Sequence, residues 1–67
     1  MASKWAVRDV IEVQDDLVAR VVIAEGDRGY KVRKIWHDGN IESMCCAEYV
    51  QARAYADAVV QTINDCR

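Results

Sequence analysis

Apolar and polar residues alternate with a period of two along residues 4–46, and this alternation predicts β-strands. Three segments rich in valine, isoleucine and tryptophan carry it, at residues 4–13, 17–25 and 30–37. They are separated by Gln14-Asp15-Asp16 and by a glycine-flanked loop at residues 26–29. Because both connections are short, we expect the strands to form an antiparallel meander.

The segment 40–46 is compatible with two structures. Asp38-Gly39 before it is a frequent two-residue hairpin turn, which predicts a short fourth strand. Alternatively, Ser43 caps the start of a helix. We favour the strand, because a hairpin turn connects two antiparallel strands and the segment 40–46 would be the second of them.

From residue 47 to residue 64 the apolar period changes to 3.6, which predicts one amphipathic helix. One stripe of this helix is apolar along its whole length: Tyr49, Ala52, Ala56, Val59, Val60 and Ile63. The expected fold class is therefore α+β, a meander of three or four strands with a C-terminal helix packed on one face. Sixty-seven residues are expected to form a single domain over 1–67.

The two faces of the predicted sheet differ in composition. In the expected register, Ile11 lies opposite Ala19 and Ile23 opposite Val32. A fourth strand at residues 40–46 would place Ile41 opposite Trp36 and Cys45 opposite Val32, both on the core face. The core face then carries Trp5, Val7, Ile11, Val13, Ala19, Val21, Ile23, Val32 and Trp36. The opposite face mixes cations with apolar side chains, and we predict a binding surface there: Arg8, Val10, Arg20, Val22, Lys31, Arg33, Ile35 and Met44.

Two charged residues, Asp9 and Lys34, fall on the predicted core face, where an unpaired charge is costly. A β-bulge at Asp9, or a row that the helix leaves uncovered, would account for them. A functional Asp9–Lys34 pair is the alternative.

Composition describes a folded domain of modest charge. The chain is 52% hydrophobic and 30% charged, with a net charge of −2. Residues 1–37 hold seven Lys or Arg and six Asp or Glu, whereas residues 38–67 hold two and five. The N-terminus does not resemble a secretory signal, no apolar run is long enough to span a membrane, and the three cysteines are expected to be reduced thiols, so we expect a cytoplasmic protein.

Catalytic and metal-binding signatures are not found in the sequence. His37 is the single histidine and stands at a predicted turn without a nucleophile near it in sequence. Cys45, Cys46 and Cys66 lack the spacing of a zinc site. We therefore expect neither an enzyme nor a bound cofactor or metal.

A sheet face that mixes arginines with aliphatic side chains is typical of a protein interface. In size and composition the chain is similar to the small accessory proteins of bacteriophages and mobile elements, some of which inhibit host defences, as anti-CRISPR proteins do. This similarity implies a non-catalytic adaptor or inhibitor that docks a larger protein in the cytoplasm of a bacterial or infected host cell. Homodimerisation through the same face is a further hypothesis.

Two other binding modes stay open. A sheet backed by one helix is similar in outline to the AP2 DNA-binding domain and to the N-terminal domains of phage-type integrases, which implies DNA binding by Arg8, Arg20, Lys31 and Arg33. The helix also carries acidic residues that could form a second binding surface: Glu48, Asp57 and Asp65.

Overall fold

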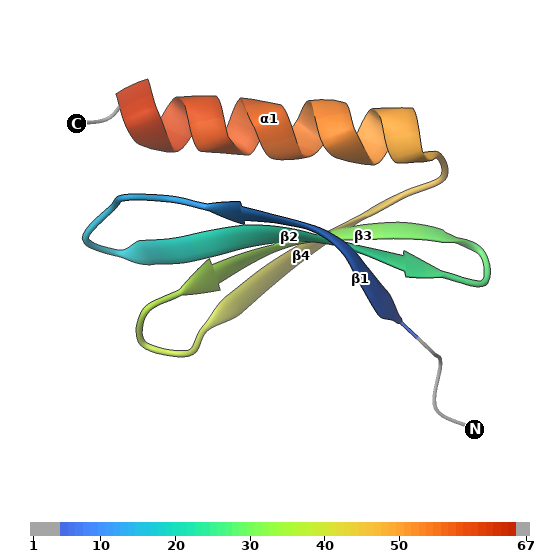
Figure 1. Cartoon of the computed structure of the whole chain (residues 1–67), viewed down its shortest axis with the longest axis horizontal. Coiled ribbons are helices and arrows are strands. Elements are labelled where there is room, and N and C mark those ends of the chain that lie inside the picture. The colour runs from blue at the N-terminus through green and yellow to red at the C-terminus, as the bar shows by residue number, and fades with distance from the viewer. Residues whose placement is uncertain (1–4, 66–67) are drawn as a thin grey trace.

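The computed structural model describes residues 5–65 as one antiparallel sheet with a helix along one face (Figure 1). The elements are β1 (Ala6–Glu12), β2 (Val18–Gly26), β3 (Gly29–Trp36), β4 (Ile41–Cys46) and α1 (Tyr49–Asp65). The strands lie in the sheet in the order in which they occur in the chain. The α+β meander is confirmed, and the segment 40–46 forms its fourth strand rather than the start of a helix.

The core lies between the helix and the two central strands. Val21, Ile23 and Val32 point from the sheet toward α1 and are almost fully buried. Ala52 and Ala56 on the facing side of α1 are also completely buried. Because alanine has only a methyl side chain, the helix can approach the sheet closely at these positions. We call this side of the sheet the inner face.

The β2–β3 hairpin has the register expected from the sequence from its turn as far as Arg20. A bulge between Val18 and Arg20 then places Val18, and not the expected Ala19, opposite Trp36, and Val18 is buried in the core. Ile23 lies opposite Val32, and Gly26 opposite Gly29 closes the turn. Gly29 has a φ of +147°, and a Cβ atom on it would lie 2.6 Å from the carbonyl oxygen of Cys46. Glycine is therefore required there both for the backbone conformation and for the close approach of the chain that follows β4.

The β1–β2 hairpin differs from the expected register, because Ile11 lies opposite Val21 and not Ala19. The Asp15 carboxylate accepts hydrogen bonds from the backbone N–H groups of Leu17 and Val18, at 2.9 and 3.0 Å. This Asx-type turn removes Leu17 from the ladder and lengthens the loop. The displacement is an even number of residues, so Ile11 keeps its inner-face position.

A β-bulge interrupts β1 between Val7 and Asp9, near the position proposed from the charge of Asp9, but Asp9 itself stays on the inner face opposite Ile23. The bulge adds one residue, so the side chains before it change faces. Val7, expected in the core, is 60% exposed on the other side of the sheet. Trp5 is also displaced from the core, and its ring packs against Gly26. Arg8, expected on the open face, lies on the inner side, with its guanidinium carbon 4.4 Å from the ring centre of Tyr49.

The β3–β4 hairpin is displaced by one residue, and this changes the face of every β4 side chain. Trp36 donates a backbone hydrogen bond to the oxygen of Asn40 at 2.9 Å, and the Gly39 N–H donates to the oxygen of Trp36 at 3.1 Å. These bonds define a three-residue loop ending at Gly39, whose φ is +97°. The expected two-residue turn would need positive φ at Asp38 as well, and none of the described residues other than glycine has a positive φ.

The displaced register corrects three predicted positions. Met44 lies opposite Val32, on the inner face, whereas it was predicted on the binding face. Cys45 lies opposite Lys31, and Ile41 opposite Ile35, so both leave the core side on which they were expected. Ile41 is 56% exposed.

Helix α1 begins at Tyr49, two residues later than predicted, and ends at Asp65. The backbone N–H of Glu48 donates to the side chain of Gln51, and the oxygen of Glu48 accepts from the N–H of Ala52. Glu48 thus caps the helix. Among residues 5–65 no helix is long and apolar enough to cross a membrane. The predicted strand residue Lys4 and the thiol of Cys66 lie outside the described residues.

Candidate functional site

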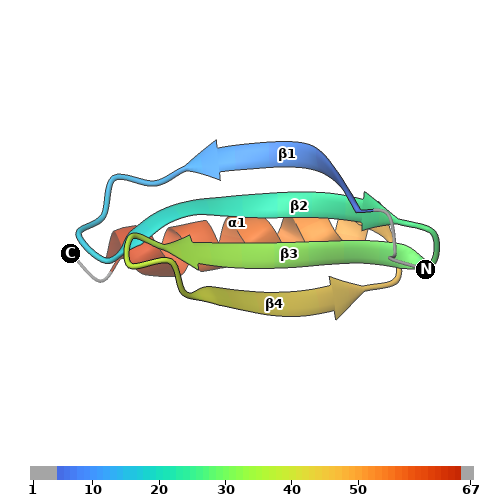
Figure 2. The same cartoon turned by 90° about the horizontal axis from the view of Figure 1, so that it is seen from below.

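The side of the sheet that faces away from α1, which we call the outer face, is not covered by any described element (Figure 2). The registers of the three hairpins assign three residues of each strand to it. They are Val7, Val10 and Glu12 of β1; Arg20, Val22 and Ala24 of β2; Lys31, Arg33 and Ile35 of β3; and Ile41, Ser43 and Cys45 of β4.

Apolar and cationic side chains share the central rows of this face. Val22 lies between Val10 and Arg33 across the sheet, and only 5% of it is exposed, although no helix covers it. Val10 beside it is 50% exposed. In the next row Ile35 is flanked by Arg20. The long stems of arginine side chains can cover neighbouring aliphatic groups, which accounts for the low exposure of Val22.

One corner of the outer face is formed by Trp5. The Lys31 ammonium lies 4.5 Å from the centre of its indole ring, a cation–π distance. Beside the indole is a depression of about 390 Å³, which is also lined by Gly29, Tyr30 and Cys45. Its walls are mostly apolar, so it is suited to an aliphatic or aromatic side chain from a partner.

The structure brings together most of the predicted binding residues but not all of them. Six of the eight share the outer face: Val10, Arg20, Val22, Lys31, Arg33 and Ile35. Arg8 and Met44 are on the inner side. Trp5 and Ile41 were not predicted to lie on the outer face. The bulge in β1 places Trp5 there and the three-residue loop before β4 places Ile41 there, and the expected strand registers contained neither feature. The dipeptide Asp38-Gly39 is compatible with a loop of two residues and with one of three, so the sequence did not determine on which face Ile41 lies.

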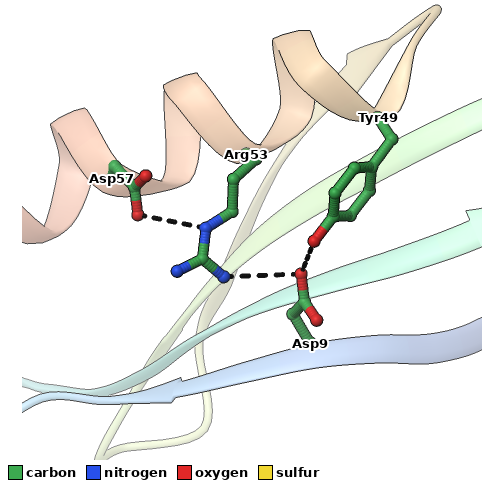
Figure 3. A network of polar contacts seen from close by, with 4 residues as sticks. All are labelled: Asp9, Tyr49, Arg53 and Asp57. Atoms are coloured by element: carbon green, nitrogen blue, oxygen red, sulfur yellow. Dashed lines mark hydrogen bonds and ion pairs between the residues drawn. The ribbon is translucent and has the colours of Figure 1, made fainter.

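A polar network on the inner side ties the edge strand β1 to the helix (Figure 3). The Tyr49 hydroxyl donates a short hydrogen bond to the Asp9 carboxylate, and the same oxygen lies 3.4 Å from the Arg53 guanidinium. Arg53 also contacts Asp57, one helical turn away, at 3.3 Å. We call these four residues the Asp9 network. Asp9 therefore pairs with Arg53 and Lys34 with Glu42, so the Asp9–Lys34 pair considered as the alternative is not formed.

Electrostatics within this network follow from its partners. The hydrogen bond to Asp9 is the main reason why the pKa of Tyr49 is raised, and partial desolvation adds to it. The carboxylates of Asp57 and Asp9 raise the pKa of Arg53, with Asp57 the stronger influence. The hydrogen bond to Glu25, at 2.9 Å, raises the pKa of Arg8. Each raised pKa keeps the proton on Tyr49, Arg53 or Arg8, so the shifts are those of hydrogen-bond and ion-pair donors and not of a group that accepts a proton as a base.

The three acidic residues proposed as a second surface do not form one patch. Glu48 precedes the helix, whereas Asp57 is held by Arg53 within the Asp9 network. Asp65 accepts a hydrogen bond from Gln61 at 3.0 Å, close to the other end of α1. These positions are spread along the whole helix, so they give no concentrated negative surface.

The candidate chemical groups have ordinary surroundings. The Nε2 atom of His37 lies 3.1 Å from the backbone oxygen of Asp15, where it joins two turns at one end of the sheet. Cys45 is exposed and Cys46 is partly buried, and both are free thiols. Residues 5–65 contain no group of three or more His, Cys, Asp or Glu side chains placed to hold a metal ion.

Comparisons with protein-family models, with curated proteins and with solved structures gave no match to this chain.

Proposed function

We propose that this chain is a non-catalytic binding module, an adaptor or inhibitor, which docks a larger protein through the outer face of its sheet. The observation that carries the proposal is that this uncovered face combines exposed aliphatic side chains with arginines. Val10 and Ile41 are 50% and 56% exposed, and Arg20 and Arg33 stand beside the aliphatic rows. Interfaces are enriched in arginine and in aromatic side chains, and the Trp5 corner adds such a side chain.

The corrections to the register favour a protein partner over DNA. Transfer of Arg8 to the inner side removes one of the four proposed DNA contacts, and the outer face gains Ile41 instead. Three cations remain, of which Lys31 already lies over Trp5. Neither Arg20 nor Arg33 forms an ion pair with another of the residues 5–65, so both can contact an acidic group of a partner. A phage or mobile-element origin and a cytoplasmic location stay predictions.

A capture experiment with matched variants tests the proposal. The chain is immobilised, and the proteins that it retains from a candidate host lysate are quantified for the wild type, Ile35→Asp and Arg20→Glu. Val50→Asp is the control, because Val50 is 76% exposed on the helix and far from the outer face. We expect the specific partner to be lost in both outer-face variants and retained in the control. Retention by both outer-face variants would contradict the proposal.

The DNA alternative is tested separately by a gel shift with duplex DNA at several salt concentrations. If the three outer-face cations each contacted a phosphate, the logarithm of the affinity would fall with the logarithm of salt with a slope of about −2.7. We expect no binding at low salt. Binding with such a slope that is abolished by Arg33→Glu would replace the protein-docking proposal by DNA binding.

A further inference from the structure

The edge strand β4 has the properties of a strand that can accept another strand. Its pairing with β3 continues without a bulge from Ile41 opposite Ile35 to Cys46 opposite Tyr30. Five of its six residues are exposed, and Glu42 is its single charged residue. Charges, prolines and bulges are the usual means of preventing edge pairing. A regular edge strand with a single charge has little such protection.

The backbone groups that β4 offers at this edge can be identified from the hairpin. Trp36 and Asn40 are joined by a backbone hydrogen bond, so they form a hydrogen-bonded pair of the β3–β4 ladder. Along an antiparallel ladder, hydrogen-bonded pairs alternate with pairs that are not hydrogen-bonded. Glu42, Met44 and Cys46 therefore bond to β3. The N–H and C=O groups of Ile41, Ser43 and Cys45 point away from β3, toward the open edge.

The inner side of β4 is also left open by the helix. α1 lies behind β2 and β3, with β4 beyond its edge in Figure 2. A groove of about 320 Å³ remains between β4 and α1, lined by Met44, Tyr55 and Val59 together with the Lys34–Glu42 ion pair. Met44 is 46% and Tyr55 is 39% exposed. A groove with both apolar and charged walls thus runs beside the unpaired edge.

We propose that β4 pairs antiparallel with β4 of a second copy of this chain, with the two-fold axis at Ser43. In this register Ser43 lies opposite the partner's Ser43, and Ile41 opposite the partner's Cys45. Every outward N–H and C=O group of the three edge residues then has a partner. The two sheets become one continuous sheet, and the two grooves meet above the new pair of strands.

Charge and hydrogen bonding select this register from its neighbours. A shift of one β4 strand along the other by a single residue would place inner-face side chains opposite outer-face side chains. The neighbouring registers that compete with this one are therefore those shifted by two residues. One such displacement would place Glu42 opposite the partner's Glu42, and directly opposed like charges are destabilising. The other would place Met44 opposite the partner's Met44 and leave the groups of Ile41 without a partner in β4. With the axis at Ser43, Glu42 lies opposite the partner's Met44.

The side chains on both faces of the paired strands support the same arrangement. On the inner face, Met44 and Tyr55 of each copy cover exposed apolar surface of the other. On the outer face, Ile41 packs beside the partner's Cys45. The dimer takes up only Ile41 and Cys45 at the margin of the outer face, so it leaves the centre of that face, around Val10, Val22 and Arg33, free for the docking proposed above. Strands of six residues bury less than the roughly 1,200 Å² of a standard stable interface, so the association is weak and concentration-dependent.

Two substitutions at one position test the pairing and its register together. Molar mass is measured by light scattering and sedimentation over a concentration series, with a reductant present so that Cys45 and Cys46 cannot cross-link. The wild type is expected to dimerise as concentration rises. Met44→Glu should abolish the dimer, because each new carboxylate faces the partner's Glu42. Met44→Lys should retain or strengthen it, because each new ammonium faces that same glutamate.

A third variant removes an edge donor without changing the side-chain charge. Ser43→Pro deletes an N–H group that points away from β3, so the ladder within the monomer is kept. We expect a folded monomer at every concentration, with the fold verified by circular dichroism. Dimerisation of this variant to the wild-type extent would overturn the proposal.

The remaining outcomes are equally decisive. A wild type that stays monomeric at all concentrations overturns the proposal. Equal loss of the dimer in Met44→Glu and Met44→Lys overturns the register with its axis at Ser43. A dimer that survives both substitutions but is lost in Ile35→Asp would place self-association on the outer face instead.

Discussion

The two edges of the sheet are built differently. β1 is interrupted by a bulge at Arg8, and its Asp9 carboxylate is held by two side chains of α1. β4 is regular, and its ion pair joins Glu42 to Lys34 of the neighbouring strand, not to the helix. A helix that covers the middle of a four-stranded sheet can secure one edge with side chains while the other stays open for pairing.

The largest effect is expected where the chain after β4 crosses the β2–β3 turn. Gly29→Ala should lower the free energy of unfolding by about 2–3 kcal/mol, since backbone strain in this φ region alone costs roughly 1–3 kcal/mol. The added methyl group would also collide with the oxygen of Cys46. Gly39→Ala is the control, with a positive φ but no atom within 4 Å of the new Cβ, and should cost about 1 kcal/mol. Urea denaturation of both variants measures the difference, and equal losses would contradict this account.

A smaller difference is expected between the carboxylates of the two edges. Asp9→Ala should destabilise the chain by about 1–2 kcal/mol, because it leaves Tyr49 and Arg53 without their shared acceptor. Glu42→Ala should change stability by no more than about 0.5 kcal/mol, because the Glu42 side chain is largely exposed to water in its ion pair with Lys34. Both are measured by urea denaturation in dilute solution. A larger loss for Glu42→Ala would reverse the comparison of the two edges.

The Asp9 network also predicts a pH dependence. Tyr49 has a raised pKa in the folded chain, so above its ordinary pKa of about 10 the unfolded chain loses this proton more readily. The stabilisation is complete below that pH and is lost as pH rises through the folded pKa. Thermal unfolding of Tyr49→Phe should therefore begin at a lower temperature than that of the wild type at pH 8, and the gap should narrow at strongly alkaline pH. A difference in unfolding temperature between the two proteins that widens at alkaline pH would contradict a stabilising role of the Tyr49–Asp9 hydrogen bond.

The smallest effect concerns the stacking of Arg8 on Tyr49. Arg8→Lys keeps the charge near Glu25 but replaces the planar group over the ring. We expect a barely measurable change in the temperature of thermal unfolding and no change in partner capture, because Arg8 is not on the outer face. Loss of the partner in this variant would return Arg8 to the binding surface.

Local patterns along the chain were sufficient to predict the strands, the helix and the β2–β3 register near its turn, because these depend on side-chain periodicity and on short glycine turns, whereas the bulge between Val18 and Arg20 was not predicted. Ile23 opposite Val32 follows from the length of one loop. The tertiary structure was needed wherever a single residue changes the face of a strand. The bulge at Arg8 transferred Arg8 to the inner side and Trp5 to the outer face. In the loop before β4 only Gly39 has a positive φ, and the resulting three-residue loop transferred Met44 to the inner side and Ile41 to the outer face.

The physical reason is that alternation specifies which residues share a face within one strand, but not how that strand is aligned with its neighbours. The Asx-type turn at Asp15, the three-residue loop before β4 and the contacts of Tyr49 with β1 set the alignment. The Tyr49–Asp9 contact joins atoms 40 residues apart and forms only after folding. The two turns are local, but alternation of the flanking strands is compatible with more than one loop length, so it does not select between them. The presence of a face that mixes apolar and cationic side chains was therefore predictable from residues 4–46, whereas the identity of all its residues and the open edge beside it were not.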